Sequence, residues 1–429
     1  MAERRRESAW VTLDARQLGA ASEVGVLHND RVRGKSALSF EYDATWLASG
    51  AAFMLDPRLE LYDGPQHPVA GQFGIFLDSA PDRWGRLLME RREALVAQET
   101  KRPVRALGDW EFLLGVHDHA RLGALRFRRA PDGPFIDDSE LSAPPVARLR
   151  ELEESARRLE EPDAEERPGY AGWLAVLTAP GSSLGGARPK ASFTDTDGTL
   201  WLAKFPARED RRDVGAWQFL LSELAAAAGI DVPEARLLSL SPRHRTFCAR
   251  RFDREAGSRR MFASAMTLLE RNDGEAGASY LDLAQLLQDH GAPGAIQSDL
   301  EQLFRRLVFN IMVGNRDDHL RNHGCIRTRN GWRLAPAFDV NPGAGCRRAC
   351  AGDRRAADPA GRRAGSRHRR SLPAVRRRRR AHRPADPPRR EDLAGAGTSA
   401  RPAEGRDRPR GAGISRGQLS SLERGRPRR

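Results

Sequence analysis

Residues 298–322 read SDLEQLFRRLVFNIMVGNRDDHLRN, an apolar helix pattern followed by a polar loop. The apolar residues recur at the spacing of one helix face, at Leu300, Leu303, Phe304, Leu307, Val308, Ile311 and Met312. Ser298 and Glu301 have the spacing of a capping box, and Gly314 is typical of a helix end. We therefore predict a long helix that delivers the loop 315–322.

The loop leads into a predicted hairpin over residues 325–334, with its turn at Asn330-Gly331. The loop carries Asp317 and, five residues on, Asn322, and the hairpin then returns Asp339. Phosphoryl transfer uses parts in this order: a group that orients the attacking hydroxyl, then an amide and a carboxylate that hold Mg²⁺. We predict these three roles for Asp317, Asn322 and Asp339.

A glycine-rich segment lies upstream, where residues 181–190 read GSSLGGARPK. Glycines let backbone N–H groups approach phosphates without interference from a Cβ atom. A two-residue turn, Asp197-Gly198, is predicted to join the strands on either side of it. The residues that we predict to contact nucleotide phosphates are Ser183, Gly185, Gly186, Ala187, Lys190 and Lys204.

Lysine is scarce in this chain, which has four lysines beside 68 arginines. Two of the four, Lys190 and Lys204, lie in or just after the glycine-rich segment. A compact ammonium suits a phosphate site where arginine would bring a bulky planar fork. Either half of the pattern is weak alone, because glycine-rich turns and loop Asp or Asn residues are often purely structural. Their order and spacing together favour the catalytic interpretation.

The composition excludes membrane and disulfide-rich secreted proteins. No apolar run in the 429 residues approaches the ~20 residues of a membrane helix. The charged start has no apolar core of a secretory signal. Four cysteines are too few for a disulfide scaffold and suit a reducing compartment. We therefore predict a cytoplasmic protein without a membrane partner.

The last 84 residues differ from the rest in composition. The net charge is +14, but residues 346–429 carry 26 Arg, no Lys and 8 acids, which leaves −4 on residues 1–345. A segment without aromatic residues cannot bury enough apolar surface to offset chain entropy, so we predict disorder there. The Arg, Ala, Gly and Pro bias is also typical of a GC-rich gene read out of frame, which predicts a frameshift near residue 343. The helix 300–312 would then expose part of its apolar stripe.

These motifs resemble the HipA family of serine/threonine kinases, the toxin half of a bacterial toxin–antitoxin pair. The resemblance covers about residues 9–345. It rests on FLDSAPDRWGR at 76–86, SLGGARPK at 183–190, ARRFDR at 249–254, N-x-D-x-H-x-x-N at 315–322 and FDV at 338–340.

The resemblance implies an α+β, two-lobed protein-kinase-like fold with an additional β-rich N-terminal subdomain; the C-lobe would be incomplete. The predicted parts are 1–130 (HipA-like N-terminal subdomain), 131–168 (linker and helix), 169–255 (N-lobe-like ATP-binding part), 256–345 (C-lobe-like catalytic part) and 346–429 (Arg-rich tail).

The resemblance also implies roles for single residues. Asp317 would be the catalytic base, Asn322 and Asp339 the Mg²⁺ ligands, and Lys204 the lysine that holds the phosphates of ATP. Family members autophosphorylate a serine in the glycine-rich loop. Ser183 matches that serine, and the neighbouring Ser182 is an alternative.

One position departs from the family pattern. A helix glutamate that pairs with the strand lysine is expected just after a tryptophan, but Gln218 stands there, and Glu223 is a poorly spaced substitute. This departure puts an ion pair between that helix and Lys204 in doubt.

A zinc site is a weaker alternative for this part of the chain, because its candidate ligands are irregularly spaced: His319, His323, Cys325, Cys346 and Cys350.

The predicted function is ATP- and Mg²⁺-dependent phosphorylation of a protein serine or threonine by a HipA-like toxin. The family acts on aminoacyl-tRNA synthetase-type substrates. Its partner would be a small helix-turn-helix antitoxin (HipB-like), with DNA contacted only through that antitoxin. One alternative is a catalytically degenerate member that binds its antitoxin and helps repress transcription. Another is a nucleic-acid binder acting through the tail, where Arg376–Arg380 form a basic run.

Overall fold

The computed structural model describes residues 5–32, 35–69, 71–137, 143–178, 186–275 and 277–343. Three residues singled out above, Ser182, Ser183 and Gly185, lie outside these ranges, as does the tail 346–429. The predictions of disorder, of a frameshift and of an autophosphorylation site therefore concern residues outside the described structure.

The N-terminal region is built on a four-stranded antiparallel sheet of order β3-β2-β1-β4. Its strands are β1 (Arg5–Leu13), β2 (Ser22–Val32), β3 (Lys35–Tyr42) and β4 (Leu125–Arg128). The helices are α1 (Ala44–Ala48), α2 (Gly74–Ser79), α3 (Arg83–Glu99) and α4 (Asp109–Leu114). The β-rich N-terminal subdomain that the resemblance implies is thus present, and α3 begins where Asp82 accepts a hydrogen bond from the Gly85 N–H at 2.9 Å.

A second four-stranded antiparallel sheet, of order β5-β6-β8-β7, lies within residues 169–255, for which we predict ATP binding. Its strands are β5 (Lys190–Thr194), β6 (Leu200–Lys204), β7 (Ala235–Leu238) and β8 (Thr246–Arg250). The helices around it are α5 (Leu149–Leu159), α6 (Tyr170–Thr178) and α7 (Val214–Ala227). One apolar cluster joins α3, α5 and α6 to this sheet through residues such as Trp84, Leu152, Leu174 and Trp201.

The turn between β5 and β6 is longer than predicted. The strands end at Thr194 and resume at Leu200, and the Gly198 N–H donates to the carbonyl of Asp195 at 3.0 Å. The Asp197 side chain accepts hydrogen bonds from the amide and the hydroxyl of Thr199. The Asp195 N–H still donates to the Thr199 carbonyl at 2.9 Å, so the turn spans residues 196–198 and has three residues instead of the predicted two.

The part of the chain from residue 254 to 334 contains a three-stranded sheet of order β11-β12-β13, a separate two-stranded sheet of β9 and β10, and two long helices. Its strands are β9 (Arg254–Glu255), β10 (Ser258–Arg259), β11 (Phe262–Ser264), β12 (Gly324–Thr328) and β13 (Gly331–Leu334). Its helices are α8 (Ala265–Leu268), α9 (Tyr280–His290) and α10 (Ile296–Val313). The predicted hairpin is confirmed, but its turn lies one residue earlier than predicted: Gly331 pairs with Thr328, so Arg329 and Asn330 are the turn residues.

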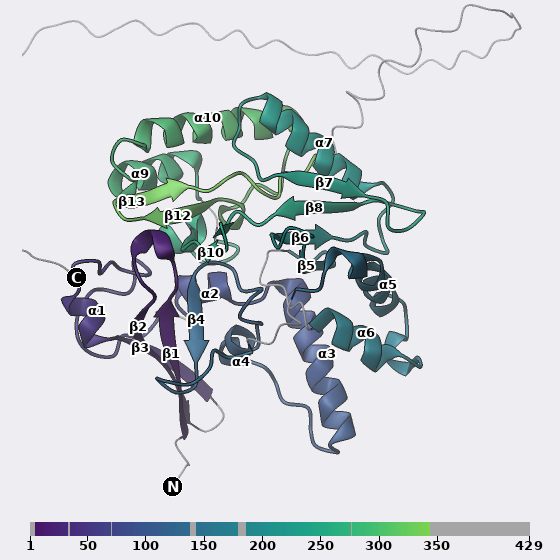
Figure 1. Cartoon of the computed structure of the whole chain (residues 1–429), viewed down its shortest axis with the longest axis horizontal. Coiled ribbons are helices and arrows are strands. Elements are labelled where there is room, and N and C mark those ends of the chain that lie inside the picture. The colour runs from purple at the N-terminus through teal and green to yellow at the C-terminus, as the bar shows by residue number, and fades with distance from the viewer. Residues whose placement is uncertain are drawn as a thin grey trace, which may run out of the picture. The chain divides into compact units, whose positions relative to one another are not determined.

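Helix α10 differs from its prediction at one end and agrees at the other. It begins two residues before Ser298, whose hydroxyl donates back to the carbonyl of Ala295 at 2.8 Å, so Ser298 is not the cap. Gly314 ends the helix in the left-handed region, as predicted. The helix buries Leu303 but leaves Met312 79% exposed, which confirms the expected exposure of part of its apolar stripe. Figure 1 shows α10 and α7 along the upper edge of the molecule.

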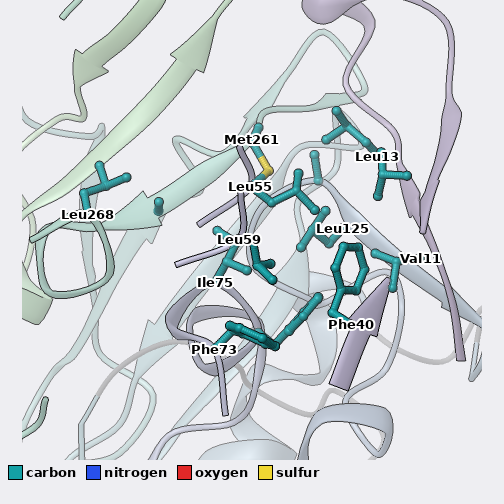
Figure 2. Packing of buried hydrophobic residues seen from close by; sticks show 14 of the residues in the cluster. Val11, Leu13, Phe40, Leu55, Leu59, Phe73, Ile75, Leu125, Met261 and Leu268 are labelled. Carbon is teal, nitrogen blue, oxygen red and sulfur yellow. The ribbon is translucent and has the colours of Figure 1, made fainter. Parts of the chain in front are cut away.

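The N-terminal sheet and the 254–334 part share a hydrophobic core. Val11, Phe40 and Leu125 belong to the same buried cluster as Met261 and Leu268 (Figure 2). Burial of apolar surface is the main favourable contribution to folding. The two regions therefore stabilise each other.

The ARRFDR motif adds polar contacts between the same regions. The buried Arg251 guanidinium donates to the carbonyls of Ala120 and Arg121 at 2.9 and 3.2 Å. The buried Asp253 carboxylate accepts from the Gly123 N–H at 2.9 Å. Because buried polar groups are costly when unpaired, these bonds fix the loop 119–123 against the kinase-like region.

Within the described ranges, no helix has the length and apolar character needed to cross a membrane.

Candidate functional site

Helix α10 ends at the loop that carries Asp317 and Asn322. The Asn322 side-chain amide donates to the Asp317 carbonyl at 2.7 Å, and the Asp317 N–H donates to the Asn315 side chain at 3.1 Å. These bonds fix the backbone of the loop. The Asp317 side chain remains 64% exposed, and Nε2 of His319 lies 3.7 Å from its Oδ1 atom.

A partly buried hydrogen-bond network that sequence reasoning missed supports this loop. Asp318 accepts a hydrogen bond from the Tyr280 hydroxyl at 2.7 Å and lies 2.8 Å from Nε2 of His323. The Asn310 amide, on α10, donates to the same Tyr280 hydroxyl at 3.0 Å. The signal in the sequence that could have identified Asp318 is its position directly after Asp317. If one of the two neighbouring carboxylates faces the substrate, the other is available to anchor the loop.

Asp339 is the centre of a second set of contacts. Its Oδ1 atom lies 2.6 Å from Nζ of Lys204 and accepts from the Gln218 amide at 3.1 Å and the Asn341 amide at 3.2 Å. Burial alone would raise the pKa of Asp339, but the Lys204 ammonium outweighs that effect and lowers the pKa to about 2. Asp339 also has a φ of 56°, a left-handed conformation that is uncommon for a residue with a side chain and recurs at functional sites.

Gln218 thus contacts the aspartate rather than the lysine. The glutamate expected at this position would have paired with Lys204, whereas the amide of Gln218 donates to the same oxygen that Lys204 contacts. Glu223 lies on the exposed side of α7. An amide can serve Asp339 as a neutral donor, which a second carboxylate could not do.

One cleft of about 480 Å³ brings most of the predicted site residues together. Its lining includes Gly186, Ala187, Lys204, Asp317, Asn322 and Asp339. The N-terminal region contributes Asp78 and Arg83 to the same lining. A cavity of this size is within the ~300–1,000 Å³ range of small-molecule sites.

Lys190 differs from the other predicted residues in its placement. Its side chain is buried and does not line the cleft described above. Its Nζ lies 2.7 Å from Oδ2 of Asp82 and donates to the Gly186 carbonyl at 3.1 Å. Contact of Lys190 with phosphate stays a prediction, and its observed partners are protein groups.

The cleft also contains a carboxyl group with an unusual pKa. Asp78, on α2, accepts hydrogen bonds from the Ser264 N–H at 2.7 Å and the Thr267 hydroxyl at 2.8 Å. Burial raises the pKa of Asp78 to about 6 despite these bonds. Sequence reasoning missed Asp78, although it lies in the 76–86 motif.

The oxygen donors of the cleft fit a hard divalent cation. Asn322 and Asp339 offer an amide and a carboxylate oxygen, and Mg²⁺ is commonly held by one or two protein oxygens together with substrate phosphates and water. The described residues contain no cluster of three or more His, Cys, Asp or Glu side chains that could hold a metal on its own. Cys325 is buried and free, and the other two cysteines of the zinc alternative lie outside the described ranges.

Comparison with known proteins identifies the relatives of this chain. Residues 182–385 match the HipA-like C-terminal domain. A serine/threonine-protein kinase toxin HipA from Shewanella oneidensis is 24% identical over 347 residues, 74% of this chain and 72% of the relative. The chain is a distant homologue of HipA. A putative kinase from Haemophilus influenzae is 31% identical over 125 residues, 26% of this chain, and this chain spans only 36% of that relative.

A solved structure confirms the fold. The Shewanella oneidensis HipA of a toxin–antitoxin complex with HipB and operator DNA matches with a TM-score of 0.52 and 19% identity, over 77% of this chain and 76% of that one. The predicted α+β, kinase-like HipA fold is therefore correct. The domain match extends to residue 385, into the segment that we predict to be out of frame.

Proposed function

We propose that this protein is an ATP- and Mg²⁺-dependent serine/threonine protein kinase of the HipA type. The carrying observation is that one cleft brings together residues from three separate segments, namely Lys204, the loop residues Asp317 and Asn322, and Asp339, beside the end of the glycine-rich segment. Phosphoryl transfer is catalysed mainly by positioning and electrostatic stabilisation, and this set of groups supplies both.

In the proposed reaction, Asp317 accepts a hydrogen bond from the substrate hydroxyl and takes its proton. The hydroxyl oxygen forms a bond to the γ-phosphorus of ATP. The bond from that phosphorus to the β–γ bridging oxygen breaks, and ADP leaves with the electron pair. The proton on Asp317 then passes to solvent, which restores the carboxylate.

Lys204 has two partners in this proposal. It pairs with Asp339 in the structure, and it would turn to the α- and β-phosphates when nucleotide enters. Asp339 and Asn322 would then hold Mg²⁺, which supplies positive charge against the phosphate oxygens. The low pKa of Asp339 keeps its carboxylate ionised and ready to bind a cation.

The proposed substrate rests on the family resemblance, and the proposed partners rest on the solved relative. We propose a protein substrate of the aminoacyl-tRNA synthetase kind, a small helix-turn-helix antitoxin as binding partner, and contact with DNA only through that antitoxin. The solved HipA–HipB–operator complex supports the last two points. Autophosphorylation at Ser183, or at Ser182 beside it, would place about −1.5 to −2 charges next to the nucleotide phosphates and switch the enzyme off.

The test uses Asp317→Asn in the full chain with labelled ATP and Mg²⁺. Transfer of the γ-phosphate to the protein or to a cell extract should fall by at least about a thousandfold, with an unchanged thermal unfolding curve. Glu223→Gln, on the exposed side of α7, is the matched control and should retain activity. Full activity in the Asp317 variant would disprove its assignment as the base.

A second candidate function is favoured by Gln218. A kinase-like protein without the helix glutamate could bind its antitoxin and assist repression without phosphoryl transfer. ATP binding in calorimetry with no transfer to any protein, combined with antitoxin binding that is unchanged in Asp317→Asn, would select this function.

A further inference from the structure

The ion pair between Asp82 and Lys190 joins two regions that lie 108 residues apart in the sequence. Asp82 precedes α3 in the N-terminal region, and Lys190 begins β5 directly after the glycine-rich segment. Their side chains are only 5% and 1% exposed. Lys190 also donates a hydrogen bond to the carbonyl of Gly186, and Gly186 lines the cleft.

Gly186 is held from the same side by the backbone of α3. The Trp84 N–H donates to the Gly186 carbonyl at 3.3 Å, so this carbonyl receives one hydrogen bond from the helix start and one from Lys190. Gly186 has a φ of 101°, a conformation that side-chain-bearing residues rarely adopt. The end of the glycine-rich segment is thus fixed in a special conformation by contacts with the N-terminal region.

We propose that Lys190 is a positioning residue, which together with Asp82 anchors the glycine-rich segment to the start of α3. The nucleotide then meets Gly186 and Ala187 in a fixed geometry, while Lys204 provides the contact with phosphate. This inference rests on the proposed nucleotide site. It assigns the FLDSAPDRWGR motif a part in that site, although the motif lies outside the kinase-like region.

The electrostatics agree with a positioning role. Burial raises the pKa of Asp82 and lowers the pKa of Lys190, and their mutual attraction does not fully offset it. Buried ion pairs often contribute little net stability, although removal of one partner is strongly destabilising. A pair of this kind fixes the geometry of the groups it joins at little gain in stability. Lys190 could reach a phosphate only by leaving Asp82 unpaired in the interior.

The test compares Asp82→Asn, Lys190→Met and the double variant in the full chain. Isothermal titration with ATP and Mg²⁺ should show the Kd rising at least fivefold in both single variants. The double variant should regain thermal stability, because no buried charge is left unpaired, but not affinity for ATP. Asp299→Asn, which removes a buried carboxylate charge paired with Arg333 away from the cleft, is the matched control and should leave the Kd unchanged.

Two outcomes would overturn the proposal. If Lys190 bound phosphate directly, Asp82→Asn would release it and leave the affinity for ATP unchanged or higher. Hydrogen exchange without nucleotide provides a readout that is independent of the proposed function: the amides of residues 186–190 should exchange faster in Asp82→Asn and Lys190→Met than in Asp299→Asn. Unchanged exchange there would refute the anchor, whereas faster exchange in a protein that binds no ATP would refute only the nucleotide site.

Discussion

Two lysine–aspartate pairs lie side by side in this protein and differ in what surrounds them. Lys190 and Lys204 are direct cross-strand partners on β5 and β6, so their side chains start on the same face of the sheet. Lys190 meets Asp82 in the interior, with side chains 1% and 5% exposed, whereas Lys204 meets Asp339 at the cleft, with side chains 12% and 22% exposed. The same chemistry thus serves as a fixed anchor in one pair and as an exchangeable contact in the other.

The largest effect that we expect is a loss of kinase activity that differs between Asp339 and Asp82. Asp339→Asn should reduce phosphoryl transfer by about a thousandfold or more, because the amide cannot supply the anionic oxygen that the cation needs. Asp82→Asn should reduce transfer mainly through weaker ATP binding, with a smaller loss at saturating ATP. Measuring kcat and KM for both variants checks this difference. Equal kcat losses would remove the distinction between anchor and contact.

The next effect is a loss of stability that should be larger for Lys190→Met than for Lys204→Met. Lys190→Met should lower the free energy of unfolding by about 3 kcal/mol or more, because Asp82 would be left as an unpaired buried charge. Lys204→Met should cost about 1 kcal/mol, because water reaches Asp339 from the cleft. Urea unfolding at pH 7 followed by circular dichroism measures both. A larger loss for Lys204→Met would contradict the burial difference.

Asp78 differs from Asp82 and Asp339, because its hydrogen-bond donors in the cleft are neutral groups and not a lysine. Its folded-state pKa of about 6 exceeds the ordinary 3.8, so between those pH values the folded protein keeps a proton that the unfolded chain has lost. The contribution of Asp78 to stability therefore falls as the pH rises through that window. Asp78→Asn should remove this slope and raise the free energy of unfolding at pH 7 by about 1–2 kcal/mol.

Urea unfolding between pH 4.5 and 7.5 measures that slope. Asp63→Asn, at an exposed position of the N-terminal region, is the control and should leave the pH profile unchanged. A steeper profile in Asp78→Asn than in the parent protein would contradict the raised pKa.

The smallest effect that we expect is on stability, at Gln218, the neutral residue that contacts the Lys204–Asp339 pair. Gln218→Glu replaces a donor to Asp339 with a second carboxylate, and like charges disfavour ionisation. Stability at pH 7 should fall by about 1 kcal/mol, and the loss should disappear near pH 5, where a protonated glutamate donates as the glutamine does. Gln218→Met, which lacks both donor and charge, should show a loss that does not depend on pH.

The sequence by itself determined the elements whose signals are local. The periodicity of the 300–312 stripe, the helix stop at Gly314 and the Asn330-Gly331 turn signal each act over a few residues. They predicted α10 and the hairpin, although the turn lies one residue earlier, at Arg329 and Asn330. The order of Asp317, Asn322 and Asp339 likewise predicted residues that line one cleft. The start of α10 was wrong because a serine with capping-box spacing can equally bond a preceding carbonyl from inside the helix.

Only the tertiary structure decided which lysine lines the cleft. Lys190 and Lys204 look alike in the sequence, and the position of Asp82, more than a hundred residues away, separates them. The roles of Asp78, Asp318 and Gln218 also depend on partners from distant segments. The physical reason is that burial and charge pairing depend on which segments meet in space, whereas sequence patterns report mainly on neighbours along the chain.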